Sequence, residues 1–393
     1  MRKKIFGVAM VTTLLVFTIS GCQKAPESST NNEILHAKDS VGEEVADLVE
    51  MTGTEAGIDR DMKDINCFIG TEENGIRIDA PAPYVPDNVY HMVLKENSAL
   101  NMELLEDFLE SDSGNISDLS EEQRKEVEQV EAANKKNEEK AMTSTFGGES
   151  LYVVSDGEKE ASFTWGTSAY YKDQELYNKC ASIYKTATEK AFDETNIAAA
   201  LSENFSIKEA KTLLMDKLHP LQITEVHVYE AYMYESENFA FYEMQFTPSY
   251  EGMGVVHSFG SVAYGENFPE GRAWVCSDGV AEVSLTASLG ETVQKDKYEE
   301  VLSWEQIENI LELYLNSGKI QGSSKCVMSK VEFAYYPLLS EDESELELVP
   351  VWHIYIPLSA WVEDEELAEE IGMNGVAWNI CVNAVSGEIV RVR

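Results

Sequence analysis

The sequence predicts an α+β fold in which antiparallel sheets have helices packed on one face. Short segments rich in Val, Ile, Tyr and Phe are separated by turn residues, a pattern typical of antiparallel strands. Two capping boxes, Ser206–Glu209 and Ser303–Gln306, each precede an amphipathic stretch and predict helices among the strands. The same order of helix and strands occurs twice in the C-terminal half, which predicts a duplicated unit there.

Residues 1–22 have the order of a secretory signal peptide. The basic start, Met1–Lys4, precedes an apolar run of roughly 15 residues, which is shorter than the ~20 residues that a membrane-spanning helix needs. The run ends in Ile19–Cys22, which resembles the bacterial lipobox. In that interpretation Cys22 is the lipidated, palmitate-bearing first residue of the mature protein. A plain cleaved signal peptide and an uncleaved membrane helix are the alternatives.

Lipidation at Cys22 would anchor the chain to the cell membrane, facing the extracytoplasmic side. The next residues, 23–40, are rich in Ser, Asn and Glu and contain little apolar surface to bury. We therefore expect them to form a flexible tether between the anchor and the folded part of the chain.

The region 41–195 is predicted to contain strands and helices without a repeat. A strand–turn–strand pattern spans 65–79, and the prolines between 81 and 86 exclude a helix directly after it. The clearest hairpin covers 151–165, around an Asp-Gly turn. A further strand is expected at 88–95, and helices are expected at 41–51, 98–109, 120–140 and 176–192.

Two helix-plus-sheet units are predicted to follow, at 196–295 and 296–393. Each unit begins with a capped helix and continues with two strands, an Ala-Trp dipeptide, a glycine turn and a last strand. Because the identity between the units is otherwise low, the duplication is inferred from this shared order. The expected helices are 206–218 and 303–315, and the expected strands are 223–234, 239–246, 273–283, 326–336, 346–356 and 377–390.

The end of the chain resembles the closing hairpin of PepSY-like domains, in which a Val-x-Trp strand precedes Val-Asp-Ala-x-Thr-Gly-Glu-Val. Here Val351-Trp352 precedes Val382–Ile389, with Asn383 and Ser386 in place of the usual Asp and Thr. The wider layout resembles uncharacterised lipoproteins of clostridial-type bacteria and the YycI-type regulators of cell-wall sensor kinases. The resemblance implies helix-on-sheet units and regulation of a partner protein, and it implies no active site.

The five cysteines after Cys22 do not suggest a disulfide framework, because their number is odd and none forms a Cys-x-x-Cys pair. We favour their interpretation as buried residues that behave like small apolar side chains. A disulfide remains the alternative, since an extracytoplasmic location permits one. The cysteines are Cys67, Cys180, Cys276, Cys326 and Cys381.

No catalytic, metal-binding or cofactor-binding motif is present, so the sequence predicts a protein that is not an enzyme. No two histidines stand at the spacing of a helical zinc site, and His227 and His353 are interpreted as structural strand residues. Ser182–Lys185 matches Ser-x-x-Lys, but the motifs that accompany it in penicillin-recognising enzymes are missing. The acidic runs 341–347 and 363–366 lack EF-hand spacing, and weak calcium binding stays open there.

Aromatic residues are the candidates for ligand contact. Trp352, Trp361 and Trp378 lie close together in the sequence. Core packing is the default interpretation for them. An exposed subset would suit a peptide or a glycan, because tryptophan and tyrosine contribute much of the energy at interfaces.

The favoured function is a lipid-anchored, non-enzymatic binding or regulatory module that acts on an envelope protein. The chain has 71 acidic and 30 basic residues and a net charge of −41, which excludes nucleic acid and anionic lipid headgroups as binding partners. A solute- or glycan-binding lipoprotein with an aromatic cleft is the alternative. A hydrolase that uses two carboxylates is the third hypothesis.

Overall fold

The protein has an α+β fold of mostly antiparallel sheets, as predicted. The computed structural model describes residues 62–96, 107–109, 152–155, 158–164, 168–184, 188–193, 205–236, 239–257, 270–286, 290–339, 345–357, 371 and 376–392. The predicted signal with its expected lipidation site Cys22, the predicted tether and the helices expected at 41–51 and 120–140 lie outside these residues. No helix in the described part is long and apolar enough to cross a membrane.

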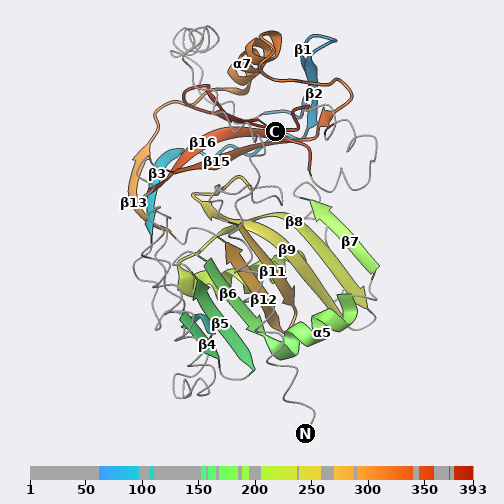
Figure 1. Ribbon diagram of the computed structural model, residues 1–393, viewed down its shortest axis with the longest axis vertical. Helices are drawn as coiled ribbons and strands as arrows, with labels where there is room; N and C mark the ends of the chain where they lie inside the picture. Colours follow the sequence, from blue (N-terminus) through green and yellow to red (C-terminus); the bar gives the residue numbers. More distant parts are fainter. Residues whose placement is uncertain are drawn as a thin grey trace, which may run out of the picture. The chain divides into compact units, whose positions relative to one another are not determined.

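The larger sheet has nine strands and is antiparallel throughout (Figure 1). Its order is β4-β5-β6-β12-β11-β9-β8-β7, and β10 pairs with β9. The strands are β4 (Tyr152–Ser155), β5 (Lys159–Thr164), β6 (Ser168–Asp173), β7 (Thr188–Asp193), β8 (Val226–Ser236), β9 (Phe239–Tyr250), β10 (Met253–Gly254), β11 (Glu270–Cys276) and β12 (Gly279–Thr286).

A six-stranded sheet contains most of the C-terminal strands. Its order is β13-β3-β16-β17-β18, and β15 pairs with β16 along the whole length of β15. On its other edge β16 pairs first with β3 and then with β17. The strands are β3 (Tyr90–Glu96), β13 (Gly290–Lys297), β15 (Lys330–Leu339), β16 (Glu345–Tyr355), β17 (Asn379–Asn383) and β18 (Ile389–Val392).

The third sheet is small and has the order β1-β2-β14. The hairpin of β1 (Ile65–Gly70) and β2 (Gly75–Ala80) is antiparallel, as the strand–turn–strand pattern predicts. The short β14 (Val327–Met328) joins β2 in parallel, which brings residues far apart in the sequence side by side.

The capping boxes predicted at Ser206 and Ser303 form, and the capping-box pattern at 120–123 lies outside the described residues. Helix α6 (Ile207–Leu218) begins after Ser206, and α7 (Trp304–Asn316) begins after Ser303. In each helix the N-cap hydroxyl accepts from the third backbone N–H, and the Glu or Gln side chain accepts from the N-cap N–H. A 3-10 turn, η3 (His219–Leu221), follows α6.

The prediction that helices cover one face of each sheet is wrong for the nine-stranded sheet. Helix α6 packs in a cluster with Met233, Met244 and Val275, whereas α5 (Gln174–Tyr184) packs in a cluster with Tyr234 and Trp274. Neighbouring residues of a strand point to opposite faces, so the two helices lie on opposite faces of the same sheet. Along β8, β9 and β11, residues that pack with α6 alternate with residues that pack with α5. These strands are therefore apolar on both faces.

Helix α7 closes the main core of the C-terminal part. Its apolar stripe, which includes Ile307 and Leu311, packs with Trp352 and Ile354 of β16. The inward side chains of the β1–β2 hairpin, such as Ile78, belong to the same core. The opposite face of β16 packs against Val256, which follows β10.

Other local predictions have mixed outcomes. The hairpin at 151–165 is confirmed as β4 and β5. The helix expected at 176–192 is wrong in its second half, because 188–193 is strand β7 and pairs with β8. Strands β6 and β13 were not predicted. The expected boundary between 195 and 196 falls inside the nine-stranded sheet, because β6 pairs with β12.

Candidate functional site

The predicted tryptophan site does not form as an exposed cluster at Trp352. This side chain is fully buried in the core under α7, and its indole N–H donates to the carbonyl oxygen of Leu302 at 2.9 Å. Trp378 is half-buried against the same core. Trp361 lies outside the described residues. The placement of Trp352 therefore favours core packing over ligand contact for this residue.

An exposed surface is present instead on the three-stranded sheet. Along β1 and β2 the isoleucines point into the core, while Phe68 and Arg77 point outward. The register places Phe68 opposite Arg77 and Arg77 opposite Val327, so these three residues form a row across the sheet. We call Phe68, Arg77 and Val327 the Arg77 surface.

The turn between β1 and β2 holds this surface in place. Asn74 donates to the carbonyl oxygens of Leu315 at 2.6 Å and Ile320 at 2.9 Å, and its side-chain oxygen accepts from the N–H of Gly322 at 2.6 Å. Gly70 has a φ of +96°, a conformation that side chains larger than hydrogen rarely adopt. The hairpin is thus tied to the end of α7 by side-chain hydrogen bonds.

The Arg77 surface combines apolar and cationic character. Phe68 is 46% exposed and Val327 is 37% exposed, which is unusual among the large apolar side chains of the described residues. A shallow hollow of about 380 Å³ beside them is lined by Asn66, Cys67, Phe68, Arg77 and Ser324. Within the described residues Arg77 has no ion-pair partner. A guanidinium between two apolar side chains suits a carboxylate that lies next to an apolar group.

The cysteine in this hollow is not set up as a nucleophile. Burial raises the pKa of the Cys67 thiol to about 12, and the hydrogen bond and negative charge of Glu308 act in the same direction. A thiol with such a pKa stays protonated at neutral pH, and the thiolate is the reactive form. The hollow therefore offers contacts for binding and no activated sulfur.

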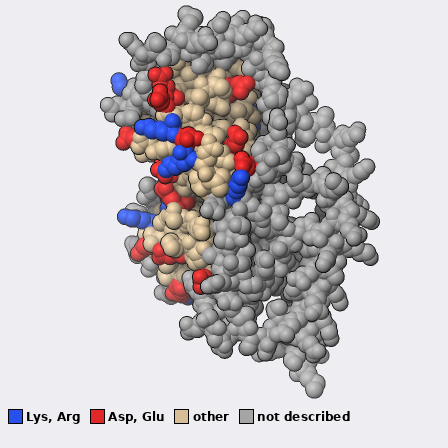
Figure 2. All heavy atoms as spheres, turned by 90° about the vertical axis from the view of Figure 1, so that its left-hand side faces the viewer, with Lys and Arg blue, Asp and Glu red and all other residues tan. Residues whose placement is uncertain are grey.

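Charge is mixed on the described part of the protein. Figure 2 shows basic and acidic side chains intermingled with uncharged residues over the described part of one face. Ion pairs such as Lys95 with Glu345, at 2.7 Å, join strands across the six-stranded sheet.

Glu345 and Glu347, the end of the first acidic run, lie in β16 and contact Lys95 and His91 of β3. These two glutamates thus belong to a sheet and not to a solvated loop; the second run, 363–366, lies outside the described residues.

A second polar feature is a cluster of histidines beside the six-stranded sheet. His227 of β8 and His353 of β16 both contact the carboxylate of Glu332, each at 3.7 Å. The ring of His257, which follows β10, stacks on Tyr229 with centroids 4.0 Å apart. His257 also meets the rings of His353 and Tyr355 edge-on. We call His227, His257, His353 and Glu332 the histidine cluster.

His257 and His353 of the histidine cluster are buried, whereas His227 is partly exposed. His353 is fully buried, and its Nε2 lies 3.1 Å from the side-chain oxygen of Asn379. Burial lowers the pKa of His257 well below its ordinary value, and the nearby His353, His227, Arg391 and Lys330 lower it further. No group of three or more side chains in the described residues has the geometry to hold a metal ion. His353 was interpreted as a structural strand residue, and it lies fully buried in β16.

Neither feature could be found from motifs. The three histidines come from separate segments, and only strand pairing and the path after β10 bring them together. The alternation of Ile76, Arg77 and Ile78 in the predicted hairpin was a usable signal that Arg77 faces outward. No protein-family model matches this chain, and comparison with curated protein sequences finds no match.

Proposed function

We propose that this protein is lipid-anchored at Cys22 on the extracytoplasmic side of the cell membrane and binds an envelope protein without catalysis. The observation that supports this proposal most is the Arg77 surface, where a cation lies between two exposed apolar side chains beside a hollow. Arginine and aromatic residues contribute strongly to protein interfaces. The partner segment that fits has a carboxylate next to an apolar side chain.

The net charge of the chain restricts the kind of partner surface that it can approach. With a net charge of −41 the chain repels extended acidic surfaces. A single local arginine can still pair with one carboxylate at short range, where salt screens less. The proposed partner therefore presents a short segment and not a broad acidic face.

We also propose that residues 196–295 and 296–393 are duplicated PepSY-like units. In support, α6 precedes strands that pair in the sequential order β8-β9-β11-β12, and α7 precedes strands that pair as β15-β16-β17-β18. The two halves thus share a capped helix followed by a four-stranded antiparallel meander.

The two alternative functions gain no support from the described residues. The solute- or glycan-binding hypothesis relied on an aromatic surface that included Trp352, which is buried. The hydrolase hypothesis needs two carboxylates in one pocket. The buried Glu230 accepts from the hydroxyl of Tyr232 at 2.7 Å, and the buried Glu243 pairs with Arg272 at 2.6 Å, so both have structural roles.

Partner capture from detergent-solubilised envelope tests the binding proposal. The full-length lipidated chain should recover a specific protein, and Arg77→Glu and Phe68→Ala should each reduce its recovery by about tenfold or more, as expected for central interface residues. Lys297→Glu is the control for the charge change, and Tyr84→Ala is the control for loss of an aromatic ring that is 72% exposed.

Both controls should leave recovery unchanged, and thermal unfolding should show that all four variants fold. Equal recovery by wild type and Arg77→Glu would show that another surface binds. Failure to recover any specific protein would count against a binding role as a whole.

A further inference from the structure

Two cysteines that are far apart in the sequence lie together in the structure. Cys180 is on α5 and Cys276 is the last residue of β11, and both are fully buried. They belong to one apolar cluster with Tyr234, Phe241 and Trp274. The thiol of Cys180 lies close enough to the thiol of Cys276 for each to shift the pKa of the other. Because α5 covers this face of the sheet, the two sulfur atoms lie between the helix and the strand that it packs on.

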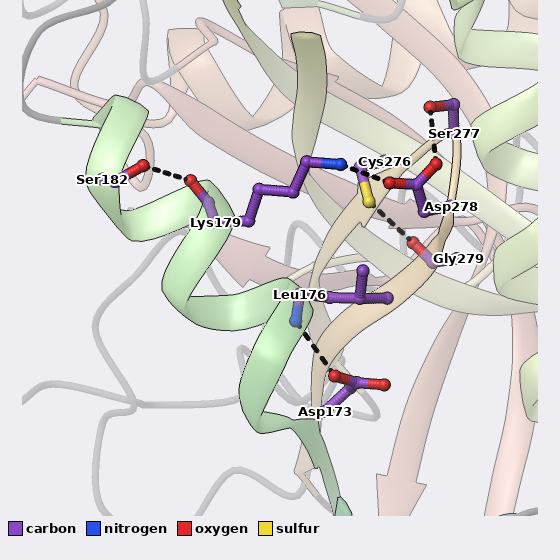
Figure 3. Close-up of polar contacts among 8 residues, drawn as sticks. All are labelled: Asp173, Leu176, Lys179, Ser182, Cys276, Ser277, Asp278 and Gly279. Atoms are coloured by element: carbon purple, nitrogen blue, oxygen red, sulfur yellow. Dashed lines mark hydrogen bonds and ion pairs between the residues drawn. The ribbon is translucent and has the colours of Figure 1, made fainter. Parts of the chain in front are cut away.

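The turn after β11 surrounds Cys276 with backbone donors. Cys276 pairs with Gly279 where β11 turns into β12, and Gly279 has a φ of +140°. The backbone of Asp278 and Gly279 acts on the sulfur of Cys276 and lowers the pKa of its thiol. Figure 3 shows this turn, with the thiol of Cys276 directed toward the carbonyl oxygen of Gly279 at 3.5 Å. Successive amide N–H groups of this kind stabilise an anion.

A lysine adds positive charge at the same place. Lys179 forms an ion pair with Asp278, and Figure 3 shows its side chain extending from α5 toward the turn. Its charge acts on both sulfur atoms. On the same helix the hydroxyl of Ser182 donates to the carbonyl oxygen of Lys179 at 2.7 Å, so this serine is engaged within the helix.

The two thiols differ in proton affinity. The hydrogen bond from Cys180, together with the backbone donors, lowers the pKa of Cys276 below its ordinary value. The same hydrogen bond and burial raise the pKa of Cys180. Of the two thiols, Cys276 therefore gives up its proton more easily than Cys180. This is the division of roles that an attacking thiolate and a resolving thiol require.

We propose that Cys180 and Cys276 form a peroxide-sensitive dithiol that closes to a reversible disulfide between α5 and β11. The Cys276 thiolate attacks one oxygen of hydrogen peroxide, the O–O bond breaks, and hydroxide leaves with Cys276 as a sulfenic acid. The sulfur of Cys180 then attacks the sulfur of Cys276, the S–O bond breaks, and the departing oxygen takes the proton of Cys180 as water. Two thiols and one peroxide give one disulfide and two waters.

Access suits a small oxidant. Both thiols are buried, yet α5 is a single layer, and Lys179 next to Cys180 is exposed. Hydrogen peroxide has only two heavy atoms and needs little opening of this layer. A bulky disulfide compound acting as the oxidant would have to displace the helix to reach the thiols. The proposal is independent of the partner-binding function, since the dithiol lies in the nine-stranded sheet and the Arg77 surface lies in the three-stranded sheet.

The experiment treats the full-length folded protein with an equimolar amount of hydrogen peroxide. We expect the intact mass to fall by two hydrogen atoms and peptide mapping to show a link between the Cys180 and Cys276 peptides. Dithiothreitol should restore the thiols. Cys67 is the internal reference, because its raised pKa predicts that it stays reduced.

Two variants separate the steps. Cys276→Ser should slow peroxide consumption by about tenfold or more, since it removes the thiolate. Cys180→Ser should leave a sulfenic acid on Cys276 that dimedone traps, with no disulfide. If wild-type Cys180 and Cys276 stay reduced under conditions that oxidise Cys67, the proposal is wrong. It is equally wrong if either sulfur pairs with a different cysteine. The oxidation state of Cys180 and Cys276 in the wild-type protein tests the proposal even if a variant fails to fold.

Discussion

A single side chain, Asn74, connects the β1–β2 turn to residues 315–322 at the end of α7. It bridges the carbonyl oxygens of Leu315 and Ile320 and accepts from the N–H of Gly322. Leu315 is in the last turn of α7 and also accepts from the N–H of Gly318, whereas Ile320 and Gly322 follow the helix. Its amide supplies both donors and an acceptor, which a carboxylate could not do.

Removal of this amide should destabilise the fold. Asn74→Ala would leave partly buried backbone groups without their hydrogen bonds, at a cost of about 2 kcal/mol or more in the free energy of unfolding. Asn66→Ala is the matched control on the same hairpin, because Asn66 is exposed and makes one hydrogen bond, of 3.3 Å, to Asp79. Its cost should stay within about 0.5 kcal/mol. Urea unfolding measures both, and equal costs would contradict the role of Asn74.

At the scale of elements, local signals located the helix starts well. The side chains of Ser303 and Gln306 and their backbone N–H groups lie within one turn of α7, so no distant contact is needed to form this cap. The end of α5 is different. Residues 188–193 were predicted to continue the helix, but they pair with the edge of β8 as strand β7. A strand edge is a tertiary feature, and it overrides local propensity.

The cap of α7 provides a test of local stabilisation. Ser303→Ala should lower the free energy of unfolding by about 1 kcal/mol, because the N–H of Gln306 loses its acceptor at the helix start. Ser317→Ala, at the other end of α7, is the control. Ser317 only donates to the carbonyl oxygen of Tyr314, so we expect a cost of about 0.5 kcal/mol or less. Thermal and urea unfolding compare the two, and a larger effect at Ser317 would argue against the cap.

At the scale of the whole molecule, the histidine cluster connects segments that belong to different sheets. Strands of the nine-stranded sheet contribute His227, and strands of the six-stranded sheet contribute Glu332 and His353. His257 stands between them on the segment after β10. The groups that face His257 are His227, Tyr229, Lys330, His353, Tyr355 and Arg391, and Glu332 contacts two of them, His227 and His353.

This arrangement predicts a loss of stability in mild acid. The pKa of His257 is lowered in the folded protein and is about 6.5 in the unfolded chain. As the pH falls below about 6.5, the unfolded chain takes up a proton first, so the free energy of unfolding decreases. Each tenfold weakening of proton affinity corresponds to about 1.4 kcal/mol of this loss.

The comparison variant is His257→Phe, which keeps a ring for stacking on Tyr229 and cannot titrate. Between pH 7 and pH 5 its free energy of unfolding should fall less than that of wild type. The exposed His219→Gln is the control and should follow the wild-type curve. Urea unfolding across this pH range measures all three proteins. Parallel curves for wild type and His257→Phe would show that His257 does not contribute.

The functional surfaces were only partly predictable. The hairpin that carries Phe68 and Arg77 follows from strand alternation, but the pairing of β14 with β2 that adds Val327 does not. Core packing was the default interpretation of Trp352 and a ligand site was the alternative, because periodicity does not say which face of a strand is covered. The proximity of Cys180 and Cys276 has no sequence signal either, since β7, β8, β9 and β10 lie between α5 and β11 along the chain.

The sequence by itself determined the α+β class, the hairpins, the two capped helices and the expectation of a lipid anchor at Cys22. These depend on neighbouring residues, whose hydrogen bonds and periodicity act over a few positions. Only the tertiary structure decided that α5 and α6 lie on opposite faces, that Trp352 is buried, and which histidines and cysteines meet. Those outcomes depend on strand order and register, which are set by burial and pairing across the whole chain.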